Sequence, residues 1–156
     1  MRVVHFLAST ITALASVSMA TPYYTVDNGC SVGFDVTISQ PLTTDNFTQL
    51  VSAKDTHWFI KFYSPTCKYS KAIAPEWVAA VEKYGSTACQ NRIYFGEVNC
   101  PDNLGLCEQN NIEGYPTVNY YSNGSYSFEY EGEREAQDLI NFASQVYRGI
   151  SNGTLT

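Results

Sequence analysis

Stretches of alternating and of helically spaced apolar residues follow one another along the chain, and they predict its secondary structure. Strands are predicted at residues 35–39, 57–63, 93–98, 117–121 and 126–130. Helices are predicted after N-cap residues at 43–45, from 67 to 85, after 101–102, and from 133 or 135 onward. The order β-α-β-α-β-α-β-β-α predicts an α/β fold with a central mixed sheet flanked by helices on both faces.

Glycine and proline positions predict where these elements end or bend. Gly85 is expected to end the long helix, which leaves Cys89 in a loop, and Pro75 is expected to kink that helix. Pro41 is expected to end the first strand. Asn123 and Gly124 form a hairpin-turn pair between the last two strands.

The two ends of the chain are expected to lie outside the folded domain. Residues 1–20 are interpreted as a signal peptide, because Arg2 precedes a short apolar run and Ser18-Met19-Ala20 supplies small residues for cleavage. The alternative is a buried N-terminal helix. Residues 21–34 are expected to be a polar leader, 35–148 a single domain, and 149–156 a flexible tail. The apolar run is too short to span a membrane.

Charge and short motifs limit the partners and the compartment. A formal net charge of −6 argues against nucleic acid and anionic membrane surfaces as partners. Three Asn-x-Ser/Thr triplets, at Asn46, Asn123 and Asn152, fit entry into the secretory pathway. The final residues carry no Lys-Asp-Glu-Leu-type retrieval signal, so both the lumen of the endoplasmic reticulum and secretion remain open.

One cysteine stands where it can react. Cys67 follows a buried strand and the turn residue Pro65, at the first turn of the long helix. Unpaired N–H groups and the positive end of the helix dipole favour its thiolate, the form that attacks disulfides. Lys68 and Lys71 add nearby positive charge, and Ser70 stands where a dithiol site would have its second cysteine.

Three segments together resemble the thioredoxin-fold domains of protein disulfide isomerases. They are Phe62 to Cys67 followed by Lys71 and Pro75-Glu76-Trp77, then Gly114 to Thr117, and then Glu131 to Phe142. The resemblance covers about residues 36–148 and implies thiol–disulfide exchange on client proteins without a cofactor. The sequence resembles a monothiol variant of such a domain, because the four-residue site is Cys-Lys-Tyr-Ser rather than the family's usual Cys-Gly-His-Cys.

The resemblance also implies a role for each matching residue. Cys67 is the attacking cysteine, and Pro116 is a cis-proline that faces it. Tyr115 would offer its backbone N–H and C=O to an extended client segment. Arg134 matches an arginine near the family's active site. Tyr69 and Thr117 complete the expected client contacts.

Two departures from the family pattern concern the release of a client. A second cysteine would attack the mixed disulfide, and a buried carboxylate on the preceding strand would take its proton. Here Ser70 and Lys61 occupy those positions. Ser70 can donate a hydrogen bond to the thiolate but cannot resolve the adduct. Lys61 is expected either to favour the thiolate or to extend to the surface.

The other four cysteines are expected to be structural. In the implied fold, Cys30 and Cys89 precede two parallel neighbouring strands, so a bridge between them is geometrically plausible. The spacing of Cys100 and Cys107 resembles a pair in some isomerase-like domains, with a second redox pair as the alternative. A metal site is a poor interpretation of this pair, because two further ligands are lacking.

Three functions are consistent with these features. The first is a secretory-pathway enzyme with one active thiol, which releases clients with a second client thiol, glutathione or a dithiol oxidoreductase. The second is a non-enzymatic client-binding or chaperone module. The third is a secreted glycoprotein with a degenerate redox site.

Overall fold

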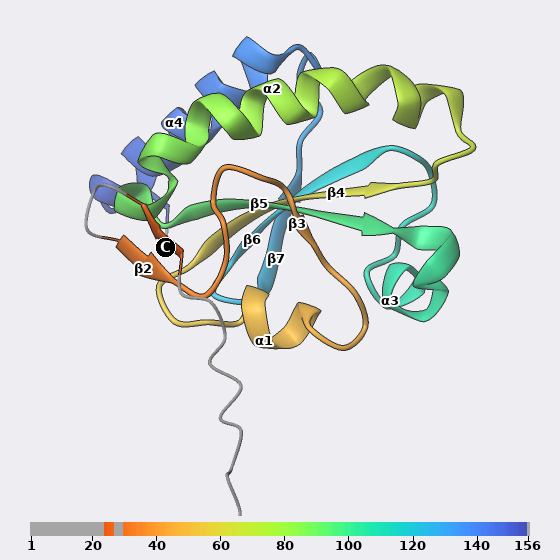
Figure 1. The fold of residues 1–156 in the computed structure, drawn as a ribbon, viewed down its shortest axis with the longest axis horizontal. Helices are drawn as coiled ribbons and strands as arrows, with labels where there is room; N and C mark the ends of the chain where they lie inside the picture. Colours follow the sequence, from red (N-terminus) through yellow and green to blue (C-terminus); the bar gives the residue numbers. More distant parts are fainter. Residues whose placement is uncertain (1–23, 27–29, 156) are drawn as a thin grey trace, which may run out of the picture.

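A five-stranded mixed sheet forms the centre of the molecule. A computed structural model describes residues 24–26 and 30–155 of the chain, with side chains from residue 33 onward. The strand order is β3-β5-β4-β6-β7 (Figure 1). These strands are β3 (Gln40–Pro41), β5 (Ile93–Asn99), β4 (His57–Tyr63), β6 (Thr117–Ser122) and β7 (Ser125–Glu129). Strands β3, β5 and β4 are parallel to one another, whereas β6 is antiparallel to β4 and β7 is antiparallel to β6. This arrangement confirms the predicted mixed sheet.

Helices cover both faces of this sheet. Helices α2 (Lys68–Asn91) and α4 (Ala136–Ser151) lie on one face, and α1 (Phe47–Val51) and α3 (Leu104–Gln109) lie on the other (Figure 1). A 3-10 turn, η1 (Cys100–Asp102), precedes α3. The core between these layers is rich in aromatic residues, and its fully buried large side chains include Trp58, Trp77 and Phe62. Such rings bury much apolar area each and dominate the packing energy.

The first predicted strand is wrong by a few residues. Residues 35–39 form a turn, because the Asp35 carboxylate accepts hydrogen bonds from the backbone N–H and the hydroxyl of Thr37 (2.9 and 2.6 Å). The parallel strand consists instead of Gln40 and Pro41, paired with Gly96 and Glu97. Proline at this edge position removes no bond that the sheet needs.

The predicted end of the long helix is also wrong. Helix α2 continues past Gly85 to Asn91, and Arg92 ends it with a left-handed φ of 54°. A Cβ atom at Gly85 would lie 2.9 Å from the Val36 carbonyl oxygen. Gly85 therefore permits close packing of the 35–39 turn on the helix, rather than a helix cap. Cys89 consequently lies within the helix.

The described segments near the two chain ends contain more regular structure than expected. The polar leader contains two paired strands, β1 (Tyr24–Val26) and β2 (Cys30–Val32). In place of a flexible tail from residue 149, α4 runs to Ser151, and Leu155 packs against the core. The signal peptide predicted for residues 1–20 lies outside the described residues. No helix in the described part of the chain has the length and apolar character needed to cross a membrane.

Candidate active site around Cys67

The end of β4 places Cys67 at the N-terminus of α2. The turn after the strand is closed by a hydrogen bond from the Cys67 N–H to the Ser64 carbonyl oxygen (3.1 Å). Cys67 is the N-cap residue, with an extended backbone, and its carbonyl accepts from the Lys71 N–H (3.1 Å). The sulfur thus lies beside the free N–H groups of the first helical turn.

Hydrogen bonds from that turn hold the pKa of the Cys67 thiol below its usual value. The largest contribution is the backbone N–H of Ser70, followed by the N–H of Tyr69, the Ser70 hydroxyl and the charge of Lys68, while desolvation opposes them. A lowered pKa raises the thiolate fraction at neutral pH. Of the two lysines expected to help, only Lys68 contributes to this shift. Lys71 lies along a hollow beside Ser70.

The loop before β6 faces the Cys67 sulfur. The thiol donates a hydrogen bond to the carbonyl oxygen of Tyr115 (Sγ–O distance 3.4 Å), and the Tyr115–Pro116 bond is cis. Pro116 is buried and Tyr115 is half-buried. The Thr117 hydroxyl donates to the Gly114 carbonyl oxygen (3.1 Å), across these two residues. The structure therefore brings Cys67, Ser70, Tyr115 and Pro116 together.

Tyr69 and Arg134 lie in a shallow hollow beside this site. The hollow has a volume of about 300 Å³ and is also lined by Ile73 and the glutamates on either side of Arg134. Both Tyr69 and Arg134 are exposed, which leaves their side chains available to a client. The segment is fixed by Glu76, whose carboxylate accepts from the Ala136 N–H at the start of α4 (2.9 Å). A carboxylate at a helix N-terminus is a favourable partner for the helix dipole.

Lys61 fits neither of its predicted roles. Its side chain is only 5% exposed, and its Nζ atom forms a salt bridge with Glu97 (2.8 Å). Its charge also lies over the rings of Tyr63 and Trp77 (5.0 and 5.3 Å to the centroids). Lys61 therefore does not extend to the surface, and it is not among the groups that lower the Cys67 pKa.

Glu97 is the site residue that sequence reasoning missed. It lies directly opposite Lys61 in the parallel β4–β5 pair. The two residues line, together with Ser70, a hollow of about 330 Å³. A signal was available: each is the fifth residue of its strand and the only Lys, Arg, Asp or Glu in it, at positions 57–63 and 93–99. Aligning the two strands in parallel would have paired the charges.

A disulfide joins η1 to α3. Cys100 and Cys107 have an S–S distance of 2.05 Å and a Cα–Cα distance of 5.8 Å. Both are buried, which shields the bond from solvent and favours a structural role over a second redox pair. Cys89 is also disulfide-bonded. The side chain of Cys30 lies outside the described residues, so its pairing with Cys89 stays a prediction.

The three candidate glycosylation sites differ in their surroundings. Asn123 and Asn152 are exposed, Asn123 at the β6–β7 turn with a φ of 50° and Asn152 at the end of α4. Asn46 is half-buried, and its Nδ2 donates to the Pro41 carbonyl oxygen (3.0 Å). The described residues contain no cluster of three or more His, Cys, Asp or Glu that could hold a metal ion.

Comparison with known proteins agrees with this geometry. A protein-family model described as Thioredoxin matches residues 38–145. The chain belongs to the thioredoxin family. It is 32% identical over 110 residues to Protein disulfide-isomerase A6 homolog of Drosophila melanogaster. The matched segment covers 68% of this chain but only 24% of that protein. It is also 33% identical over 102 residues to Protein disulfide-isomerase 5-1 of Arabidopsis thaliana. That matched segment covers 65% of this chain and 67% of the other protein.

A solved structure of the first two thioredoxin domains of Saccharomyces cerevisiae Eps1p is also similar. The TM-score is 0.69 with 30% sequence identity, over 76% of this chain and 45% of that one. The matched segment spans a quarter or less of the length of several disulfide-isomerase relatives. It covers 24% of the Drosophila protein and 19% of the Saccharomyces cerevisiae protein disulfide-isomerase. These relatives support thiol–disulfide exchange as the general chemistry of the domain.

Proposed function

We propose that this domain carries out thiol–disulfide exchange on client proteins through the single thiol of Cys67. The observation that carries the proposal is the placement of this thiol at the α2 N-terminus, where hydrogen bonds from Ser70 and Tyr69 lower its pKa. The thiolate attacks one sulfur of a client disulfide, forms a Cys67–client disulfide, and expels the other client sulfur as a thiolate.

The Tyr115 carbonyl supports client binding in this step. In the free protein it accepts a hydrogen bond from the Cys67 thiol. Ionisation of the thiol removes that donor, which leaves the carbonyl oxygen to accept from the backbone N–H of an extended client segment. Tyr69, Arg134 and Thr117 border the same surface and are proposed as further client contacts.

Release of the client requires a thiol from outside the site. The Ser70 hydroxyl is not ionised at neutral pH and cannot attack the mixed disulfide. A second client thiolate, glutathione or a dithiol oxidoreductase attacks the client sulfur instead, which regenerates the Cys67 thiolate and leaves a new disulfide. Each exchange conserves the number of disulfides, so the site isomerises or traps clients without net oxidation.

The same features favour the secretory pathway as the compartment. Buried disulfides persist where the environment is oxidising. The signal-like segment at residues 1–20 and the exposed Asn123 and Asn152 triplets agree with that environment. The endoplasmic reticulum lumen and secretion both remain within this proposal.

The test is to trap mixed disulfides of Cys67 in an oxidising secretory lysate. Alkylation at acid pH and non-reducing gels separate the adducts, with Cys67→Ala as the matched control. Wild type is expected to form adducts that reductant removes, and the variant none. Equal adduct yields from the two proteins would refute the proposal.

Titration of Cys67 separates this function from a non-enzymatic client-binding module. A thiolate that forms well below the free-cysteine value of about 8.5 supports exchange. An ordinary titration with client binding intact would favour the binding module.

A further inference from the structure

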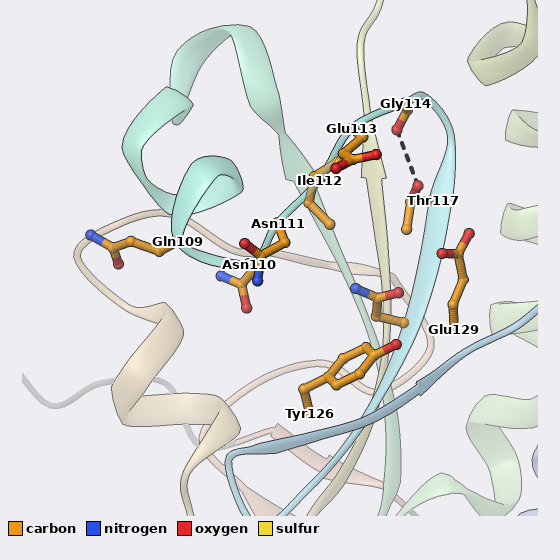
Figure 2. A pocket seen from close by; sticks show the side chains of 10 residues that line it. Gln109, Asn110, Asn111, Ile112, Glu113, Gly114, Thr117, Tyr126 and Glu129 are labelled. Carbon is orange, nitrogen blue, oxygen red and sulfur yellow. Dashed lines mark hydrogen bonds between the residues drawn. The ribbon is translucent and has the colours of Figure 1, made fainter.

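A polar hollow borders the Tyr115–Pro116 segment, and its lining does not include Cys67, Ser70, Tyr115 or Pro116. It has a volume of about 600 Å³ and lies between the 109–114 loop and strands β6 and β7. Figure 2 shows the loop side chains on one side and Tyr126 and Glu129 of β7 on the other. Its lining residues are Gln109, Asn110, Asn111, Ile112, Glu113, Gly114, Thr117, Asn119, Tyr126 and Glu129.

The floor of the hollow is the amide of Asn119, which is 3% exposed. Its Oδ1 atom is buried, and no hydrogen-bond partner for it exists among the residues that the structure describes. A buried acceptor without a partner costs about 1–3 kcal/mol. Because Asn119 lines a hollow open to solvent, a ligand that enters can supply the missing donor.

Neighbouring hydrogen bonds fix the direction of this amide. Asn110 donates its Nδ2 to the Leu106 carbonyl oxygen (2.8 Å), so its Oδ1 accepts from the Tyr121 hydroxyl (2.7 Å). The Tyr121 oxygen is then left to accept from the Asn119 amide nitrogen. Burial raises the pKa of Tyr121 to about 12, and the hydrogen bond from Asn119 opposes that rise. With the Asn119 amide nitrogen turned toward Tyr121, its Oδ1 atom lies on the other side of the amide.

The charges around the hollow select the kind of donor. Glu113 and Glu129 are exposed carboxylates on its two sides, and none of its ten lining residues is Lys, Arg or His. The Tyr126 ring, 57% exposed, lies on the same rim. Carboxylates hold a guanidinium by paired hydrogen bonds, and an aromatic ring attracts it through its face. A neutral sugar would satisfy Asn119 but would leave the two carboxylates without a counter-charge.

We propose that this hollow binds an arginine side chain of the client, a few residues away from the client cysteine. The inference rests on the proposed function, because Gly114 and Thr117 of the hollow lie directly on either side of Tyr115 and Pro116. From Tyr115 to Asn119 the chain extends about 13 Å, at about 3.3 Å per residue. A client in extended conformation along Tyr115 therefore brings a residue about two to four positions from its cysteine over the hollow.

The experiment is an NMR titration of the full chain with N-acetyl-arginine amide. The matched probe is N-acetyl-citrulline amide, which has the same shape without the charge. We expect arginine to shift the amide signals of residues 109–119 and 126–129 and to bind about tenfold more tightly than citrulline. In the double variant Glu113→Gln/Glu129→Gln the preference disappears. Glu108→Gln, an exposed α3 glutamate outside the hollow, keeps it.

A second measurement links the hollow to clients. Peptides whose cysteine is in a disulfide with glutathione carry arginine or citrulline about two to four residues away. Cys67 is expected to form its mixed disulfide faster with the arginine peptide, and the double variant is expected to remove the difference. Arginine binding without a rate difference would overturn the assignment to clients.

Two further outcomes separate the inference from the proposed function. Equal affinity for arginine and citrulline, or shifts in the hollow produced by a neutral oligosaccharide such as maltotriose instead of arginine, would overturn the arginine site. Selective arginine binding with no mixed disulfide from either peptide would leave the site in place and refute the function of Cys67.

Discussion

The hydroxyl of Ser70 accepts a hydrogen bond from the backbone N–H of Ser64 at 3.3 Å. Ser64 lies before the turn that carries Cys67, and Ser70 lies in the first turn of α2, so the bond closes the loop around the active cysteine. The same hydroxyl is one of the groups that lower the Cys67 pKa. Ser70 is therefore a positioning residue that also stabilises the thiolate, and not merely a position that lacks the second cysteine of a dithiol site.

Replacing Ser70 by Ala is expected to raise the pKa of Cys67 and to reduce stability. The thiolate loses one hydrogen bond, and the Ser64 N–H, at a buried residue, loses its acceptor. The expected cost in unfolding free energy is about 1–2 kcal/mol. The pH dependence of Cys67 alkylation reports the pKa, and urea unfolding reports the stability. Ser86→Ala is a control at a serine in α2 remote from Cys67, and an unchanged pKa in Ser70→Ala would contradict this role.

Replacing Ser70 by Cys is expected to shorten the lifetime of mixed disulfides. The introduced thiol lies where it can attack the Cys67 sulfur, which releases the client and leaves an intramolecular disulfide. Adduct yield in the lysate assay should then fall below that of wild type, while net reduction of an insulin disulfide should appear. Adducts as abundant and as long-lived as in wild type would show that release is not limited by the missing thiol.

Removing either partner of the Lys61–Glu97 pair tests a different part of the site. Glu97→Gln leaves the buried Lys61 charge without its counter-ion, and a cost of about 2–4 kcal/mol is expected. Lys61→Met is expected to cost less, because the Glu97 side chain is 30% exposed and water can solvate its carboxylate. Urea unfolding of the two single variants and the double variant measures the coupling. Equal costs for the two single variants would contradict this asymmetry.

Much of the fold was readable from the sequence because most strands and the helical faces keep a regular apolar period. The His57–Tyr63 strand was predicted to the residue. The errors fall where one residue has a tertiary function. Gly85 has the sequence signature of a helix end, yet it allows the 35–39 turn to approach α2. Asp35 begins an alternating segment, yet its carboxylate bonds Thr37 and holds a turn.

The candidate site was predicted less completely than the fold for a related reason. Cys67 and Pro116 belong to local motifs, so their roles follow from neighbours in the chain. Glu97 lies 36 positions beyond Lys61, and only the register of two parallel strands brings the two charges together. The buried Asn119 Oδ1 atom, which has no hydrogen-bond partner among the described residues, likewise depends on tertiary packing that no sequence period encodes.

Protonation of His57 is expected to destabilise the domain on mild acidification. Burial lowers the pKa of His57, against an opposing effect of Asp55, and the ring nitrogen Nδ1 lies 2.7 Å from the Tyr120 hydroxyl. The unfolded chain takes up this proton at its ordinary pKa of about 6.5, whereas the folded chain resists it. The stabilising contribution is therefore complete above the unfolded value and is lost as the pH falls towards the folded pKa. Urea unfolding of wild type and His57→Gln, between about pH 7.5 and 5.5, should show a steeper loss for wild type. Parallel profiles would mean that His57 titrates alike in both states.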